Sequence, residues 1–238
     1  SFSDTEMTAN LSLYDGISTA EIHQILIKSA NDLISKSAPN YQYAAARLLN
    51  MQLRKDVWGW DKPTDFLIFL ERNVDNGIYD PYILDKWDNK TIGAFGNYIN
   101  HNRDNSFTYA GLQQLIDKYL VKNRSSGNIY ETPQFAYMAI AMCLFDNIDD
   151  VKGAYDCYST FKINLPTPIM AGVRTNIKQF ASCVLVDVSD DLDGIFSSIH
   201  AVGKYTARRA GIGLNIGRLR PLNSPIRGGE VLHTGLIP

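Results

Sequence analysis

The chain has 238 residues, 45% of them hydrophobic and 20% charged, which is enough for a sizeable core in one large domain or two smaller ones. Its formal net charge of -2 argues against a general nucleic-acid or membrane-surface binder. No apolar run reaches the length of about 18 residues that spans a bilayer, and residues 1–10 are too polar for a signal peptide, so we expect a cytoplasmic protein that binds neither nucleic acid nor membrane.

The first two thirds of the sequence are predicted to be helical. Ser18 and Glu21 form a capping box ahead of a helix over Ala20–Ser35, and a second helix is expected from Pro39 to about Gly59. The apolar face of the first helix is predicted to consist of Ile22, Ile25, Leu26, Leu33 and Ile34. Further helices are expected over Asp65–Arg72, Tyr109–Val121, Gln134–Phe145 and Asp149–Phe161, the third of them opened by Thr132 and Pro133.

The pattern changes from Leu165 onward. Pro166 and Pro168 indicate an extended segment. A β-branched run over Ala181–Val188 predicts a strand, Asp191–Ala210 returns to helical periodicity, and an apolar stretch over Ile212–Ile216 follows. This order is typical of a βα unit in an α/β domain, and we place a domain boundary near residue 160.

A carboxylate-free, cationic stretch lies between Asp193 and Glu230. It contains the basic residues Lys204, Arg208, Arg209, Arg218, Arg220 and Arg227 and the glycines Gly211, Gly213, Gly217, Gly228 and Gly229. The forked donors of arginine guanidinium groups and exposed backbone N–H groups are well suited to bind phosphate. Pairing of these arginines with acids elsewhere in the fold explains the stretch equally well, so charge alone leaves both interpretations open.

Several familiar site patterns do not fit. The glycines from Gly211 to Gly217 are spaced one residue too widely for a dinucleotide fingerprint and follow a helix instead of a strand. None of the four histidines lies in an HExxH motif or near a CxxC motif, as expected of a metal site, and no GxSxG motif supports nucleophilic hydrolysis. We therefore expect no metal and no cofactor bound by this chain.

The three cysteines differ in their surroundings. Cys143 lies in an apolar helix and Cys157 between two tyrosines, so both are predicted to fill the core. Cys183 lies in the predicted strand, where alternation places it on the same face as Leu185. By chemistry alone it too is most often a core thiol.

Longer motifs carry a resemblance. The segments are Leu165-Pro-Thr-Pro-Ile-Met-Ala-Gly-Val-Arg174, Gln179-Phe-Ala-Ser-Cys-Val-Leu185, Arg209-Ala-Gly-Ile-Gly-Leu-Asn215 and Ser224-Pro-Ile-Arg-Gly-Gly-Glu230, with weaker likeness in Tyr41–Leu48, Tyr119–Lys122 and Tyr130–Phe135. In this order they resemble the large (alpha) subunit of class I, aerobic ribonucleotide reductases, the oxidoreductases of deoxyribonucleotide biosynthesis for DNA replication. The resemblance implies an α/β fold class: a partial ATP-cone over residues 1–59, a helical domain over 60–160, and the start of a ten-stranded α/β barrel over 161–238.

The resemblance also assigns roles to residues. A thiyl radical removes the ribose 3′ hydrogen, the 2′ hydroxyl leaves as water, and two cysteines supply the electrons; Cys183 matches the first of this pair. Substrate contacts match Thr167, Ser182, Ala210 and Gly211. The site that binds ATP or a deoxynucleoside triphosphate, and so selects the substrate, matches Asp190, Asp191, Leu192, Arg220 and Arg227. In the ATP-cone, Thr19 and Lys55 match nucleotide contacts.

Two departures from the family pattern limit these expectations. The phosphate-gripping hairpin of the ATP-cone has no counterpart before the first helices, so activity regulation by ATP is in doubt. The sequence stops at Pro238 within the expected barrel, so the radical cysteine and the second reducing cysteine are not among these residues, and we expect no turnover without a complementary C-terminal part.

The implied partners are a metal-containing, radical-generating small subunit, a thioredoxin or glutaredoxin, a ribonucleoside diphosphate and a second large subunit. The alternative is a non-enzymatic nucleotide-binding module, or a decoy that binds a complete large subunit.

Overall fold

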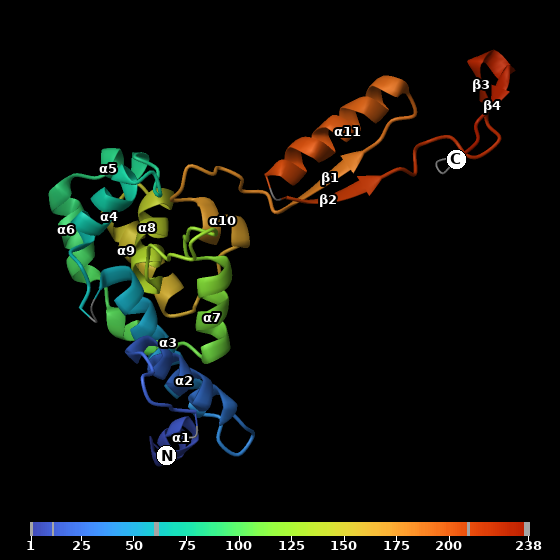
Figure 1. Cartoon of the computed structure of the whole chain (residues 1–238). Coiled ribbons are helices and arrows are strands. Elements are labelled where there is room, and N and C mark those ends of the chain that lie inside the picture. The colour runs from blue at the N-terminus through green and yellow to red at the C-terminus, as the bar shows by residue number, and fades with distance from the viewer. Residues whose placement is uncertain (1, 11, 60–61, 209, 236–238) are drawn as a thin grey trace. The chain divides into compact units, whose positions relative to one another are not determined.

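The computed structural model describes residues 2–10, 12–59, 62–208 and 210–235 (Figure 1). These residues form two compact units, Ser1–Lys178 and Gln179–Pro238. The first unit is helical, and the second contains strands and one long helix, so the α/β class predicted from the sequence is confirmed. The predicted boundary near residue 160 falls at the end of helix α9 (Ile148–Ser159) and stays a prediction. Arg209, one of the cationic residues noted above, lies outside the described residues.

The helices that were predicted for the first unit begin and end close to the predicted positions. In chain order they are α1 Phe2–Asn10, α2 Thr19–Asp32, α3 Tyr41–Trp58, α4 Phe66–Asp75, α5 Tyr82–Lys86, α6 Asn89–Tyr98, η1 His101–Ser106, α7 Tyr109–Lys118, α8 Pro133–Leu144, α9 and α10 Thr167–Gly172. The capping box of Ser18 and Glu21 is present, and Gly59 ends α3 with a φ of 78°. The sequence analysis did not predict α1, α5, α6 or η1.

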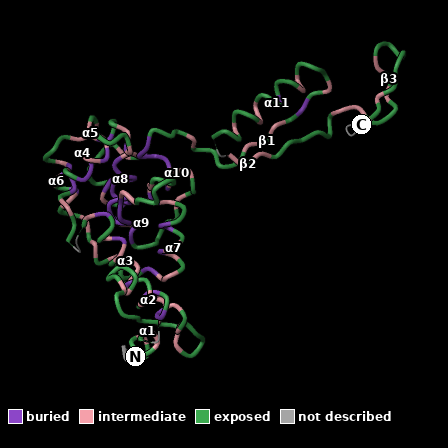
Figure 2. Tube along the Cα trace, in the orientation of Figure 1, coloured by how far each residue is buried: buried purple, intermediate pink, exposed green. Residues whose placement is uncertain are grey.

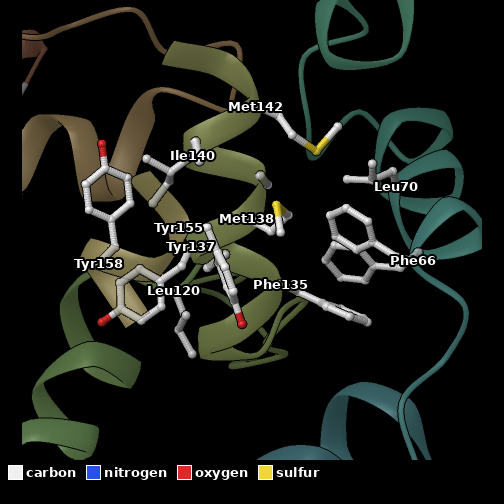
Figure 3. Close-up of a cluster of buried hydrophobic side chains, with 14 of the residues drawn as sticks. Phe66, Leu70, Leu120, Phe135, Tyr137, Met138, Ile140, Met142, Tyr155 and Tyr158 are labelled. Carbon is white, nitrogen blue, oxygen red and sulfur yellow. The ribbon is translucent and has the colours of Figure 1, made fainter. Parts of the chain in front are cut away.

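Helix α8 forms the centre of the first unit. Ten of its twelve residues are buried, as expected for a helix that is apolar on every side. Figure 3 shows Met138 and Phe135 directed toward Phe66 and Leu70 of α4, whereas Ile140 lies on the side of Tyr158 of α9. In Figure 2 the buried part of the chain is accordingly concentrated around α8 and its neighbours.

Two predictions about this unit are wrong in detail. The buried residues of α2 are His23, Ile27, Ser29 and Ala30, so the helix packs on a face next to the predicted one, and Ile34 lies beyond its end and is exposed. The segment around Pro166 and Pro168 is not extended throughout but begins helix α10. The fixed φ of proline is compatible with the first turn of a helix, where its missing N–H is not needed.

The second unit contains a parallel strand–helix–strand arrangement. Strand β1 (Cys183–Asp187) pairs in parallel with β2 (Gly211–Asn215), and α11 (Leu192–Ala207) connects them and packs against both (Figure 1). This confirms the predicted βα unit and shows that the apolar stretch after it is the second strand. A short antiparallel pair, β3 (Pro225–Ile226) and β4 (Val231–Leu232), flanks the turn η2 (Arg227–Gly229).

Candidate active site

The predicted redox cysteine lies at the open face of the two parallel strands. Residues of β1 alternate between exposed and partly buried, so Cys183 and Leu185 share one face, as predicted, and Leu185 is 89% exposed. Val184 and Val186 face the opposite way. Cys183 is therefore exposed in this unit and is not part of its core.

Four predicted site residues meet at the first residues of these strands. Cys183 is the register partner of Gly211, and the Gly211 N–H donates to the Ser182 carbonyl oxygen over 2.8 Å. A Cβ atom built on Gly211 would lie 3.7 Å from Cys183 Sγ, so the missing side chain leaves the space beside the thiol open. Ala210 precedes Gly211 directly. The arrangement offers an accessible thiol next to backbone that another molecule can approach closely.

The other two cysteines differ from Cys183. Cys143 and Cys157 are partly buried and pack against the core of the first unit, as predicted. Burial raises the pKa of the Cys143 thiol to about 11, which keeps it protonated and unreactive at neutral pH. Cys183 is thus the only exposed cysteine of the three, each of which lies in the described ranges.

The predicted effector residues around the N-terminus of α11 come together in part. Arg220 Nε donates to both carboxylate oxygens of Asp190, at 2.8 and 3.0 Å, and the Arg220 backbone N–H donates to the same carboxylate. Asp191 caps α11 by accepting a hydrogen bond from the Gly194 N–H at 2.7 Å, and this bond lowers the pKa of its carboxyl group. Leu192 follows at the start of the helix and is exposed.

The structure bears on the two interpretations of the cationic stretch. Arg218 pairs with Asp187 at 3.1 Å, and Arg220 pairs with Asp190, so two of the arginines find acids that precede the stretch in sequence. Arg227 is exposed, and no ion pair of its side chain is present among the residues of the described ranges. Pairing therefore explains part of the stretch, and the Arg227 side chain is exposed and accessible to an external anion.

Arg227 lies in a tight turn between the short strands. Its φ is 51°, and the next two residues, Gly228 and Gly229, have φ values of 70° and 100°. Glycine adopts this left-handed backbone without strain, whereas arginine does so rarely. The turn thus joins a cationic side chain to a left-handed run of backbone at Gly228 and Gly229.

Thr167 belongs to the first unit. It is the first residue of α10 and is exposed, with its Oγ1 atom 3.4 Å from the hydroxyl oxygen of Tyr119. Tyr119 also lines a cavity of about 340 Å³ whose other polar lining groups are Ser106, Thr108, Gln114, Tyr137 and Asn164. The predicted substrate threonine thus lies next to the side chain of Tyr119, for which the sequence analysis assigned no role.

The predicted ATP-cone contacts lie on two helices. Thr19 is the first residue of α2, and Lys55 lies in the last turn of α3; both are exposed. Helices α2 and α3 pack against each other. No group of three or more side chains suited to hold a metal ion occurs within the part of the chain that the structure describes. Nor does that part contain a helix with the length and hydrophobicity needed to cross a bilayer.

A fully buried charged cluster was missed by the sequence analysis. Arg174 binds the Glu131 carboxylate through two of its nitrogens, and the Tyr79 hydroxyl donates to the same carboxylate. Burial, followed by the charge of Glu131, raises the pKa of Tyr79 well above its ordinary value, so this phenol stays protonated. Arg174 and Glu131 both lie in the motifs quoted above, but nothing in the sequence indicated that they are partners.

Comparison with known proteins gives two matches to family models. One, described as "Ribonucleotide reductase, all-alpha domain", covers residues 105–178, and the other, "Ribonucleotide reductase, barrel domain", covers residues 181–238. Similar curated proteins include "Ribonucleoside-diphosphate reductase 1 subunit alpha" of Escherichia coli, 48% identical over all of this chain and 32% of its own length. The alpha subunit of enterobacteria phage T4 is 45% identical over 98% of this chain and 32% of its own. That of Helicobacter pylori is 31% identical over 99% and 30%. The chain spans about a third of the length of these relatives.

Proposed function

The chain belongs to the ribonucleotide reductase large-subunit family, with the helical domain followed by the start of the barrel, and we propose that it forms the N-terminal part of a ribonucleoside-diphosphate reductase. The observation that carries this proposal is the exposed Cys183 thiol beside Gly211 on the open face of β1 and β2. Reduction of a ribonucleotide to a 2′-deoxyribonucleotide releases the 2′ hydroxyl as water and consumes two electrons. We assign one electron-donating thiol to Cys183, which forms a disulfide with a second cysteine in each turnover.

We propose substrate contacts in each unit. In the second unit, Ser182, Ala210 and Gly211 lie next to Cys183 and offer backbone groups and a hydroxyl, and in the first unit Thr167 offers a hydroxyl. Such groups bind ribose and phosphate oxygens without adding charge. The substrate is a ribonucleoside diphosphate.

The effector site in this proposal lies at the N-terminus of α11. Asp190, Asp191 and Leu192 form its loop, and Arg220 is fixed to that loop by its ion pair with Asp190. Arg227 supplies an exposed guanidinium for the phosphates of ATP or a deoxynucleoside triphosphate. Thr19 and Lys55 are proposed as nucleotide contacts of an ATP-cone.

Partners follow from the same assignment. Turnover needs the segment that corresponds to the remaining length of the relatives, a radical-generating small subunit with its metal centre, and a thioredoxin or glutaredoxin that reduces the disulfide. A second large subunit is proposed to cover the apolar outer face of α11, where Leu192, Phe196 and Ile199 are 70%, 64% and 61% exposed. These residues recur every three to four positions and so form one stripe along the helix.

The test is reconstitution of the reductase. The chain is mixed with a polypeptide that corresponds to the rest of the relatives, the small subunit, a reductant and ATP, and the formation of dCDP from CDP is measured. We expect activity from the mixture and none from the chain alone. Sustained CDP reduction by the chain alone, or binding of dTTP without activity in any mixture, would contradict the proposal, and the second result would favour the non-enzymatic nucleotide-binding module.

A further inference from the structure

The buried charged cluster of the first unit connects segments that are distant in sequence. Tyr79 follows α4, Glu131 precedes α8, and Arg174 follows α10; all three side chains are fully buried. Glu131 also accepts a hydrogen bond from the Val121 N–H at 2.6 Å, and the Arg174 carbonyl oxygen accepts one from the Asp80 N–H at 2.9 Å. The pair is therefore held in place from both sides.

The remaining hydrogen bonds of Arg174 are the informative ones. Its Nη1 donates to the Met170 carbonyl oxygen at 2.5 Å, and its Nη2 donates to the Tyr119 carbonyl oxygen at 3.1 Å. Met170 lies in α10, the helix that begins with Thr167, and the Tyr119 side chain reaches the Thr167 hydroxyl. One guanidinium thus binds the backbone of both segments that form this contact, α10 with Thr167 and the segment with Tyr119.

Stability alone does not account for this arrangement. Apolar side chains of similar volume often stabilise an interior as well as a buried ion pair does, because the charges lose their hydration. Only a guanidinium has donors in a fixed fork that reach a carboxylate and two backbone carbonyls at once. What the cluster provides is a fixed geometry for α10 relative to Tyr119.

We infer that Arg174 and Glu131 are positioning residues that hold Thr167 beside Tyr119, and that the two hydroxyls together bind the diphosphate of the substrate. The inference rests on the proposed function for the identity of the ligand, but not for the positioning itself. Tyr119 then acts as a specificity residue, because its hydroxyl supplies a donor next to the one that Thr167 supplies. Arg174 and Glu131 act through the backbone and touch no substrate.

The experiment compares three variants. Arg174→Lys keeps the charge but loses the fork, and Tyr119→Phe removes a single hydroxyl and leaves the fold intact. Arg103→Lys is the matched control, because Arg103 pairs in the same unit with Asp156 at 2.6 Å and with Ser159, both in α9. Each is assayed in the reconstituted enzyme for KM and kcat with CDP, and in the isolated chain for hydrogen exchange of the amides of residues 169–173.

We expect KM for CDP to rise about two- to tenfold in Arg174→Lys and Tyr119→Phe, the range that the loss of one hydrogen bond gives, while kcat changes less than twofold. Exchange in α10 should be about tenfold faster in Arg174→Lys than in the parent chain, and unchanged in Arg103→Lys. If the parent enzyme is active and both substitutions leave KM for CDP unchanged, the hydroxyls of Thr167 and Tyr119 do not bind the substrate together. Unchanged exchange in Arg174→Lys overturns the positioning role, and this result is read without any reductase activity. A parent that never reduces CDP refutes the proposed function instead.

Discussion

The buried Asp104 and the partly buried His101 of the first unit are expected to change the stability of the fold in opposite directions as pH falls. Burial raises the pKa of the Asp104 carboxyl to about 6, and burial, followed by the charge of Arg54, lowers the pKa of the His101 imidazole to about 4. Asp104 accepts a hydrogen bond from Gln134 Nε2 at 2.8 Å, and the His101 ring lies edge-on to Trp58 and Phe135. Arg54 bonds to the Asp104 carboxylate and to the His101 carbonyl oxygen.

The two pKa shifts act on stability with opposite sign. An acid whose pKa is raised in the folded state takes up a proton, and the fold gains stability, as pH falls through about 6; between pH 7 and pH 5 this adds on the order of 1 kcal/mol for Asp104. A base whose pKa is lowered stays neutral in the folded state while the same group in the unfolded chain takes up a proton below about 6.5, so His101 costs the fold on the order of 2 kcal/mol over the same range. The two effects therefore largely cancel and leave a small net loss of stability.

Replacement of Asp104 by Asn keeps an oxygen that accepts the hydrogen bond from Gln134. It removes the carboxyl group whose protonation stabilises the fold as pH falls. Urea unfolding of Asp104→Asn and of the parent chain at pH 7 and pH 5 should therefore differ, the variant losing on the order of 1 kcal/mol more than the parent on acidification. His101→Gln is the complementary variant and should gain stability relative to the parent over this range. Parallel stability curves for the parent and Asp104→Asn would refute the assignment of the raised pKa to this carboxyl group.

Two further predictions concern the core and the effector loop. Gly96→Ala should destabilise the chain by about 1–3 kcal/mol, because the new Cβ would lie 2.9 Å from Phe66 Cβ. Gly93→Ala on the same helix meets nothing within 4 Å and should stabilise the chain by about 0.5–1 kcal/mol. Thermal unfolding compares the two, and equal effects would show that the packing of α6 on α4 is misassigned. Arg220→Ala and Arg227→Ala should each weaken dTTP binding by about 1.5–3 kcal/mol in calorimetric titration of the reconstituted complex, with CDP binding less affected. Arg218→Ala, which removes an exposed pair with Asp187, should bind dTTP as the parent does, and parent-like binding by all three variants would remove the effector role of this loop.

Local signals in the sequence predicted the elements that local chemistry determines. The capping box of Ser18 and Glu21 and the glycine at the end of α3 need only neighbouring residues, and both are present. The alternation around Cys183 also depends on sequence neighbours alone, and it correctly placed Cys183 and Leu185 on one face. The prolines at the start of α10 were ambiguous, because their fixed φ suits an extended segment and a first helical turn alike.

Partnerships between distant residues could not be predicted in this way. Glu131 and Arg174 are 43 residues apart, and nothing in their neighbourhoods distinguishes Glu131 from the other acidic residues as the partner of this arginine. The same holds for Asp190 and Arg220, which are 30 residues apart. Whether Cys183 is exposed depended on which strand pairs with β1 and on which face α11 covers, and these are properties of the folded unit.

A single turnover shows whether Cys183 supplies electrons for ribonucleotide reduction, because that step would oxidise its thiol to a disulfide. The reconstituted enzyme is reduced, freed of reductant and given CDP once, and its peptides are mapped under non-reducing conditions. We predict a disulfide that joins Cys183 to a cysteine in the segment corresponding to the rest of the relatives, while Cys143 and Cys157 remain free thiols and Cys183→Ser, although folded, forms no dCDP beyond background. Full activity of the Cys183→Ser complex would show that Cys183 supplies no electrons to the reaction.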